Sequence, residues 1–277
     1  MLHPHPKKQY KNKLMLTMFR HISLNSTNSK DPKLEEQQDE VNYLLAHKQK
    51  IMSNVASVYK SDAQILEDHF NMLVATSEYS KREQCLEVIN LIIIRGKINA
   101  SMSYSRFELN CNNCYLTRFP NQLLVSPEYA GYWANLTTLV LSNNRLRCLP
   151  PIIGKCNNLK IFYADNNQLE NFPFSLWSCK NLHTLNLDNN RVESFPPEIQ
   201  RLKALKYLSV KGNQLRYLPE SMRDMTLERL YVEGNSLEEL PQFKSGFFRD
   251  IYGKVLSNQQ VLDSQKLNIF AKPRSRL

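Results

Sequence analysis

From residue 136 onward, hydrophobic and polar positions alternate in a pattern that occurs five times. Each unit has an x-L-x-L-x segment, then a polar stretch with an asparagine, then apolar residues and a proline. The units are LTTLVLSNNRLRCLP from Leu136, LKIFYADNNQLENFP from Leu159, LHTLNLDNNRVESFP from Leu182, LKYLSVKGNQLRYLP from Leu205 and LERLYVEGNSLEELP from Leu227. The asparagines and the prolines both recur at spacings of 23, 23, 23 and 22 residues. Two series in one register indicate structural repeats.

This alternation predicts one short strand in each unit. Successive side chains of a strand point to opposite faces, so the two leucines of x-L-x-L-x lie on the same face. One unit cannot bury them alone, but a stack of units with a parallel sheet can. The asparagine amide after each strand is placed to satisfy turn backbone groups that no strand partner reaches. The predicted ladder is Cys114, Asn144, Asn167, Asn190, Asn213 and Asn235, with Cys114 in a degenerate first repeat. We therefore predict an α/β solenoid of about six repeats over residues 105–241, with the parallel sheet on its concave face.

The stretch CNNC contains two cysteines, Cys111 and Cys114, at the spacing of half a zinc site or a redox pair. In the repeat register, Cys111 takes a strand leucine position, and cysteine is accepted there as a small hydrophobe. No second C-x-x-C and no paired histidines complete a zinc set in the sequence. We expect both thiols in the core, with no metal site and no cofactor.

The first two repeats are 30 residues apart instead of 23, and the seven extra residues lie within the stretch LLVSPEYAGYW. Trp133 falls where Cys156 and Cys179 fall in later units. We therefore predict a short loop or helical turn on the convex side that returns to the core at Trp133.

A solenoid exposes apolar edges at its two ends, and both flanks of the repeats have helical periodicity. Residues 33–104 predict a bundle of about three helices, the first over 34–60 and the last ending at Gly96, since glycine often ends a helix. Residues 242–277 predict a capping helix with Phe247, Phe248 and Ile251 on one face, followed by a basic tail.

The net charge of +10 belongs to the two ends of the chain. Residues 1–30 hold six Lys or Arg and no acid, and residues 242–277 hold seven Lys or Arg and two acids. Residues 31–241 hold 23 basic and 24 acidic residues, which makes nucleic acid an unlikely partner because no folded face carries the excess. Residues 1–32 are expected to be a disordered leader; their composition also resembles a mitochondrial presequence, and the basic ends would allow contact with an anionic membrane.

Three rows of side chains point outward from the predicted strands, six, four and two residues before each asparagine. Tyrosine and arginine are enriched at binding hot spots, so we predict an anchor cluster on this face, although tyrosine also has high strand propensity. The candidate partner-binding residues are Tyr163, Tyr207, Tyr231, Arg229, Asp165, Asp188, Lys211 and Glu233. The aspartates form an acidic pair for a lysine or arginine of a partner, and we assign no catalytic residue.

The 23-residue unit, with Leu-Pro after the asparagine turn and an apolar residue three positions later, resembles the Ras-suppressor type of leucine-rich repeat over about residues 105–241. The resemblance implies a non-enzymatic module that binds a protein partner on the concave sheet, as an intracellular scaffold or adaptor or as a bacterial effector. It also implies a cytoplasmic location, in a host cell in the case of an effector. Two alternatives stay open: an enzyme such as a ubiquitin ligase whose repeats select the substrate, with Cys85 as the cysteine outside the repeats, and a membrane-tethered adaptor.

Overall fold

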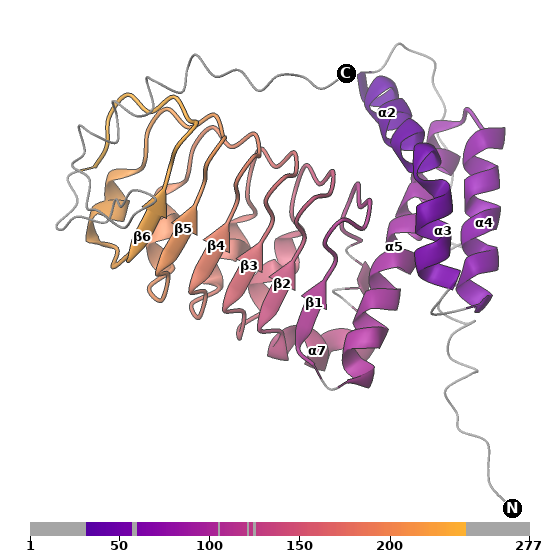
Figure 1. The fold of residues 1–277 in the computed structure, drawn as a ribbon, viewed down its shortest axis with the longest axis horizontal. Coiled ribbons are helices and arrows are strands. Elements are labelled where there is room, and N and C mark those ends of the chain that lie inside the picture. Colours follow the sequence, from indigo (N-terminus) through magenta and orange to yellow (C-terminus); the bar gives the residue numbers. More distant parts are fainter. Residues whose placement is uncertain (1–31, 57–59, 105, 121, 124–125, 242–277) are drawn as a thin grey trace, which may run out of the picture.

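The computed structural model describes residues 32–56, 60–104, 106–120, 122–123 and 126–241. Six parallel strands form a single sheet in chain order, as Figure 1 shows. The strands are β1 Glu108–Asn110, β2 Thr138–Val140, β3 Ile161–Tyr163, β4 Thr184–Asn186, β5 Tyr207–Ser209 and β6 Arg229–Tyr231. The leucine at the centre of each strand, or the phenylalanine in β3, is buried on the core side. The predicted α/β solenoid is confirmed.

Short 3-10 helices form the side of the solenoid opposite the sheet. They are η2 Pro127–Tyr129, η3 Pro151–Lys155, η4 Phe174–Ser178, η5 Pro197–Arg201 and η6 Glu220–Asp224. A repeat proline immediately precedes each of η3 to η6, and its fixed φ and missing N–H end the extended segment there. The proline carbonyl then accepts the N–H of the apolar residue three positions on, which is fully buried, as at Leu176.

The repeated asparagines link each unit to the one before it. Asn190 is buried, its Oδ1 accepts the N–H of Leu169 at 2.9 Å, and its Nδ2 donates to the Ala164 carbonyl at 3.0 Å. The residue before it in each turn has positive φ, a conformation that asparagine and glycine adopt at low cost. These residues are Asn113, Asn143, Asn166, Asn189, Gly212 and Gly234.

Among the described residues, four helices precede the sheet, where about three were predicted for residues 33–104. They are α2 Pro32–Ala46, α3 Lys48–Ala56, α4 Lys60–Ala75 and α5 Tyr79–Ser103. The first predicted helix is interrupted at His47. The His47 ring Nδ1 lies 2.8 Å from the Tyr43 carbonyl, and the His47 backbone N–H donates to the Leu44 carbonyl. The prediction that a helix ends at Gly96 is also wrong, because α5 continues to bury Ile98 before it reaches β1.

The inserted segment between the first two repeats contains η2 and the short helix α7 Ala130–Asn135. It supplies Trp133, which is buried and donates its Nε1–H to the Leu123 carbonyl at 2.8 Å. The predicted return to the core through a helical turn is confirmed. The predicted C-terminal capping helix and basic leader lie outside the described residues.

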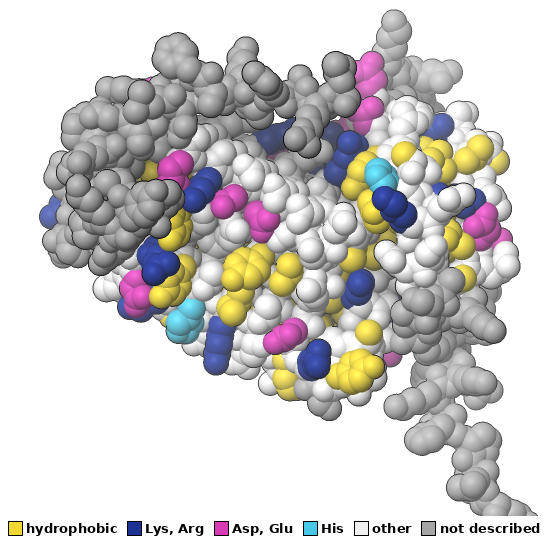
Figure 2. Space-filling view, in the orientation of Figure 1, with side chains coloured by type: hydrophobic (Ala, Val, Ile, Leu, Met, Phe, Trp, Pro, Cys, Tyr) yellow, Lys and Arg dark blue, Asp and Glu magenta, His cyan; other side chains and the backbone are white. Residues whose placement is uncertain are grey.

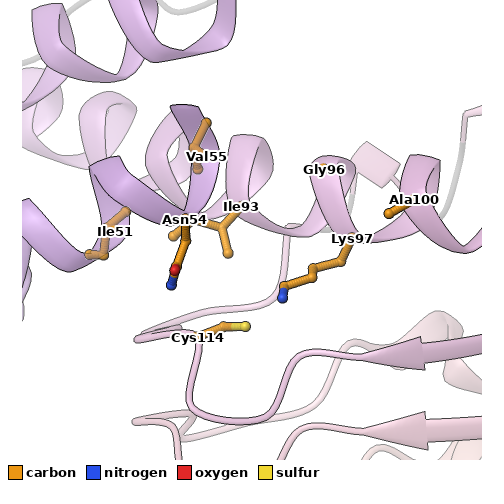
Figure 3. Close-up of a pocket in the computed structure, with 8 residues that line it drawn as sticks. All are labelled: Ile51, Asn54, Val55, Ile93, Gly96, Lys97, Ala100 and Cys114. Carbon is orange, nitrogen blue, oxygen red and sulfur yellow. The ribbon is translucent and has the colours of Figure 1, made fainter. Parts of the chain in front are cut away.

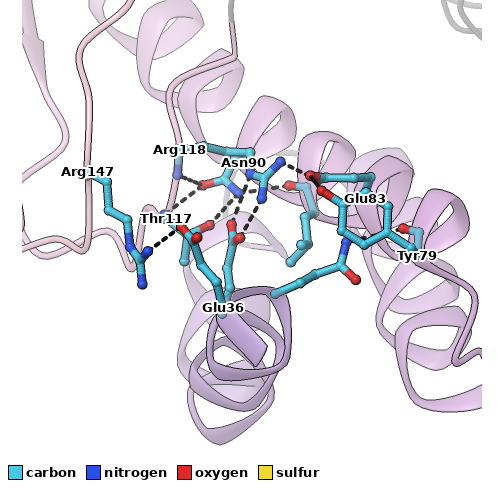
Figure 4. Close-up of polar contacts among 10 residues, drawn as sticks. Glu36, Tyr79, Glu83, Asn90, Thr117, Arg118 and Arg147 are labelled. Carbon is cyan, nitrogen blue, oxygen red and sulfur yellow. Dashed lines mark hydrogen bonds and ion pairs between the residues drawn. The ribbon is translucent and has the colours of Figure 1, made fainter. Parts of the chain in front are cut away.

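The helices dock on the first repeat through buried polar contacts (Figure 4). Asn90 of α5 is fully buried, donates to the Thr117 Oγ1 at 3.0 Å and accepts the Thr117 N–H at 3.1 Å. The guanidinium of Arg118 pairs with Glu40 of α2 and Glu83 of α5. These three ionic side chains are half-buried and paired, and their contacts join the helices to the repeats.

Candidate protein-binding face

The concave side of the sheet aligns equivalent positions of all six strands. The register pairs Glu108, Thr138, Ile161, Thr184, Tyr207 and Arg229 as one row and Asn110, Val140, Tyr163, Asn186, Ser209 and Tyr231 as another. Figure 2 shows hydrophobic, basic and acidic side chains side by side on the visible face rather than a patch of one kind. Such mixed chemistry suits a polar partner surface that also offers apolar contacts.

Aromatic and basic side chains meet over β5 and β6. The Lys211 Nζ lies 4.5 Å from the centre of the Tyr231 ring and 3.6 Å from a Glu233 carboxylate oxygen. The Arg229 guanidinium lies 5.8 Å from the centre of the Tyr207 ring, and Tyr207 remains 38% exposed. Each of these cation–π contacts pairs one tyrosine with one cation. We call Tyr207, Lys211, Arg229, Tyr231 and Glu233 together the Tyr–Arg cluster.

Tyr163, which the sequence suggested as part of this group, lies on β3 and therefore outside the Tyr–Arg cluster. In its row, Asn186 and Ser209 separate it from Tyr231. Adjacent strands lie about 4.8 Å apart, so the two tyrosines are roughly 14 Å apart along the sheet. Tyr163 could contact a partner only as a separate point of attachment.

The two aspartates occupy the third outward position on neighbouring repeats. Asp188 Oδ1 accepts the Ser209 Oγ–H at 2.6 Å and the Lys211 N–H at 2.7 Å. Burial raises the pKa of Asp188, the hydrogen bonds and Lys211 oppose the rise, and the Asp165 charge adds to it. Asp165 accepts the Ser142 Oγ–H at 2.6 Å. Since the Asp188 charge is held at a cost in free energy, a cationic group placed against this pair would be stabilising.

A row of amides beside the aspartates was not singled out from the sequence. Asn143 donates to the Asn112 Oδ1 and Asn189 donates to the Asn166 Oδ1, both at 2.9 Å. All four side chains are exposed. In the later repeats the signal was present as the Asn-Asn pairs 143–144, 166–167 and 189–190, of which only the second, buried member was assigned a role.

We also searched the described residues for a metal site, a membrane-spanning helix and a nucleophilic cysteine. No group of three or more His, Cys, Asp or Glu residues there is arranged to hold a metal ion. None of the described helices combines the length and the apolar composition that crossing a membrane requires. Cys85, the cysteine of the enzyme alternative, is fully buried in α5, and burial raises its pKa to about 11, which disfavours a nucleophilic role at neutral pH.

Two models of leucine-rich repeats match the chain: one described as two copies of the leucine-rich repeat over residues 134–177, and one described as the leucine-rich repeat over residues 180–237. These segments hold five of the six strands, together with the ladder from Asn144 to Asn235. Residues 134–177 and 180–237 therefore match leucine-rich repeats, and the parallel sheet is that of a leucine-rich repeat solenoid.

Solved structures with similar repeats include a leucine-rich repeat protein of Leptospira interrogans and the BIR2 ectodomain from Arabidopsis thaliana. The first is 26% identical, with a TM-score of 0.39, and the match covers 56% of this chain and 46% of the Leptospira chain. The second is also 26% identical with a TM-score of 0.39, and the match covers 50% of this chain and 71% of the ectodomain. This leucine-rich repeat chain therefore spans less than half the length of the Leptospira protein. A search of curated proteins found no match.

Proposed function

We propose that this leucine-rich repeat protein is a non-enzymatic binding module that holds a protein partner on its concave sheet. Leucine-rich repeats generally mediate protein–protein interaction. The observation that carries the proposal for this chain is the Tyr–Arg cluster, in which Tyr207 and Arg229 stay exposed while cation–π contacts limit their freedom. Side chains that are already ordered lose less conformational entropy on binding, and tyrosine and arginine are the residues that most often anchor an interface.

The charges on the sheet suggest how a partner would be oriented. The acidic pair Asp165 and Asp188 lies on the β3 and β4 repeats, while Arg229 lies at β6. We infer that a partner places a lysine or arginine against the acidic pair and an acidic or aromatic group near Arg229. Both hydrogen bonds to Asp188 that join described residues fall on Oδ1, so its other oxygen is the acceptor for such a cation.

The finer assignments follow from the resemblance noted in the sequence. The 23-residue spacing and the proline-led 3-10 helices support the Ras-suppressor type of repeat, whose members are scaffolds, adaptors or delivered effectors. We propose such a role in the cytoplasm, of the host cell if the protein is an effector.

The test is affinity purification from lysate with the intact chain and a triple variant, Tyr163→Ala, Tyr231→Ala and Arg229→Ala. A matched control changes two aromatic residues and one arginine away from the sheet: Phe174→Ala, Tyr217→Ala and Arg201→Ala. Arg201 lies over the Phe174 ring at 5.0 Å, which reproduces the cation–π pairing of the sheet. Circular dichroism establishes that all three proteins are folded.

We expect a protein that the intact chain and the control retain and that the sheet variant loses. A partner retained equally by all three proteins would place the interface elsewhere, with the helices α2 to α5 as the next candidate surface. A partner lost only by the control would refute the concave assignment.

A further inference from the structure

A cavity lies where the helices meet the first repeat (Figure 3). Ile51 and Val55 of α3, Ile93, Gly96 and Lys97 of α5, and Cys114 of the CNNC turn line it. Lys97 is exposed, so the cavity opens to solvent beside it, and the Lys97 side chain extends toward the Cys114 thiol. A small molecule can therefore approach Cys114 through the cavity, although the residue as a whole is only 5% exposed.

The CNNC turn holds its two thiols together. The Asn144 amide spans the turn: its Nδ2 donates to the Cys111 carbonyl at 2.8 Å, and its Oδ1 accepts the Cys114 N–H at 3.1 Å. Cys111 is fully buried, Asn112 and Asn113 form the turn between the two cysteines, and the Cys114 thiol donates to the Asn112 carbonyl at 3.5 Å. Because the first and fourth residues of a turn lie less than about 7 Å apart at their Cα atoms, the turn places a second cysteine next to the one that lines the cavity.

Cys114 differs from the other buried thiols in how easily it ionises. Interaction with the Cys111 thiol lowers the pKa of Cys114, and Lys97 lowers it as well, while burial opposes both. The same interaction, together with burial, raises the pKa of Cys111 well above its usual range. Burial raises the pKa of Cys156 to about 12 and that of Cys179 to about 11. The thiolate is the attacking species in disulfide exchange, which favours Cys114.

We propose that Cys114 and Cys111 form a redox-active dithiol that is oxidised by small disulfides entering the cavity beside Lys97. The Cys114 thiolate attacks one sulfur of the disulfide, whose S–S bond breaks, and the first small thiolate leaves and takes up a proton. Cys111 then loses its proton and attacks the Cys114 sulfur of the mixed disulfide, which releases the second small thiol. Two protein thiols are oxidised to one disulfide, and one small disulfide is reduced to two thiols.

The experiment uses the full chain carrying Cys148→Ser, because Cys148 is exposed and would react on its own account. The folded protein is incubated at pH 8 with bis(2-hydroxyethyl) disulfide, a small neutral reagent. Remaining thiols are alkylated at intervals, and peptide mass spectrometry assigns each cysteine. Cys156 and Cys179, which occupy equivalent positions in successive repeats, are internal controls.

We expect a Cys111–Cys114 disulfide to form at least roughly tenfold faster than Cys156 or Cys179 reacts, since a pKa of about 12 leaves about one Cys156 thiolate in ten thousand at pH 8. Cys111→Ser should stop the reaction at the mixed disulfide on Cys114. Lys97→Met should slow the first step several-fold. Gly96→Leu should slow it too, because a side chain added at Gly96 meets no atom within 4 Å at its Cβ and so enters the cavity.

The proposal is overturned if Cys111 and Cys114 become oxidised only as fast as Cys156 and Cys179, which would mean that unfolding exposes all four. It is overturned equally if the mixed disulfide on Cys114 persists while Cys111 is intact. Thermal melting of each variant separates a lost reaction from a lost fold, and Gly96→Leu is informative because it leaves both thiols in place.

Discussion

Removing one buried amide of the ladder tests whether the asparagines hold the repeats together. Asn190 is 6% exposed, follows β4 in the chain and bonds back to the repeat of β3, so it joins two repeats that each have neighbours on both sides. Asn190→Ala removes the hydrogen bonds to the Leu169 N–H and the Ala164 carbonyl, at 2.9 and 3.0 Å. The variant leaves the Leu169 N–H without its side-chain partner, while the Ala164 carbonyl loses one of two donors and keeps the Asn167 Nδ2–H at 3.2 Å.

An unsatisfied buried N–H costs about 1–3 kcal/mol and an ordinary hydrogen bond contributes about 0.5–1.5 kcal/mol, so the two losses together predict a fall of about 3 kcal/mol in the free energy of unfolding. With a urea m-value of about 3 kcal/mol/M, the midpoint should fall by about 1 M. The assay is urea unfolding followed by circular dichroism and by tryptophan fluorescence from Trp133 and Trp177, both buried in the repeats.

The neighbouring asparagine provides a matched control. Asn189 is exposed with φ of 53°, and glycine occupies the same place at Gly212 and Gly234. Asn189→Gly keeps the turn conformation and should change stability by no more than about 0.5 kcal/mol, as surface substitutions usually do. If Asn190→Ala cost no more than Asn189→Gly, the amide ladder would not stabilise the stack and the reasoning would be refuted.

Three further substitutions should change the stability of the fold in a direction that the structure predicts. Gly212→Ala should cost about 1–2 kcal/mol by thermal melting, since φ is +62° and the added Cβ would lie 2.5 Å from the Asn189 Oδ1; an unchanged melting temperature would contradict this. Gly96→Ala should instead stabilise α5 by up to about 1 kcal/mol, because no atom lies within 4 Å of the added Cβ; a lower melting temperature would contradict the open space there. Asp188→Asn should stabilise the fold at neutral pH. Since the folded pKa of Asp188 is raised, ionisation costs stability as pH rises through the range above the unfolded pKa of about 3.9. The gain should vanish in urea titrations below about pH 4, and a gain that is independent of pH would refute the electrostatic cause.

The solenoid could be predicted because its determinants are periodic and local. A leucine pair, an asparagine and a proline recur in one register, and each has one physical task in every unit. The same counting placed Trp133 in the core across an insertion. Outward rows followed from the period of two, so the alignment of Tyr207 with Arg229 could be anticipated before their contact was seen.

The N-terminal helices were less predictable because distant contacts shape them. The break at His47 depends on a ring that bonds to the Tyr43 carbonyl and stacks on Tyr115 with centroids 4.5 Å apart. Arg118 pairs with Glu40, 78 residues earlier in the chain. No local sequence pattern predicts contacts between residues so far apart in the chain. The continuation of α5 through Gly96 likewise rests on tertiary packing, which overrides the weak helix propensity of one glycine.

Asp188 occupies an outward position of its repeat at which the fold does not require a particular residue. Its repeat needs leucines inward, an asparagine in the turn and a residue tolerant of positive φ, and those positions are occupied as required. The outward position two residues before the asparagine has no such requirement, yet it carries a carboxylate whose charged form is disfavoured by burial and by Asp165. An asparagine there would keep an oxygen for the Ser209 Oγ–H and the Lys211 N–H. A partner cation would favour the ionised form that the isolated fold disfavours, so Asp188→Asn should strengthen the fold while weakening the complex. A variant that gained stability and bound the partner equally well would remove the acidic pair from the interface.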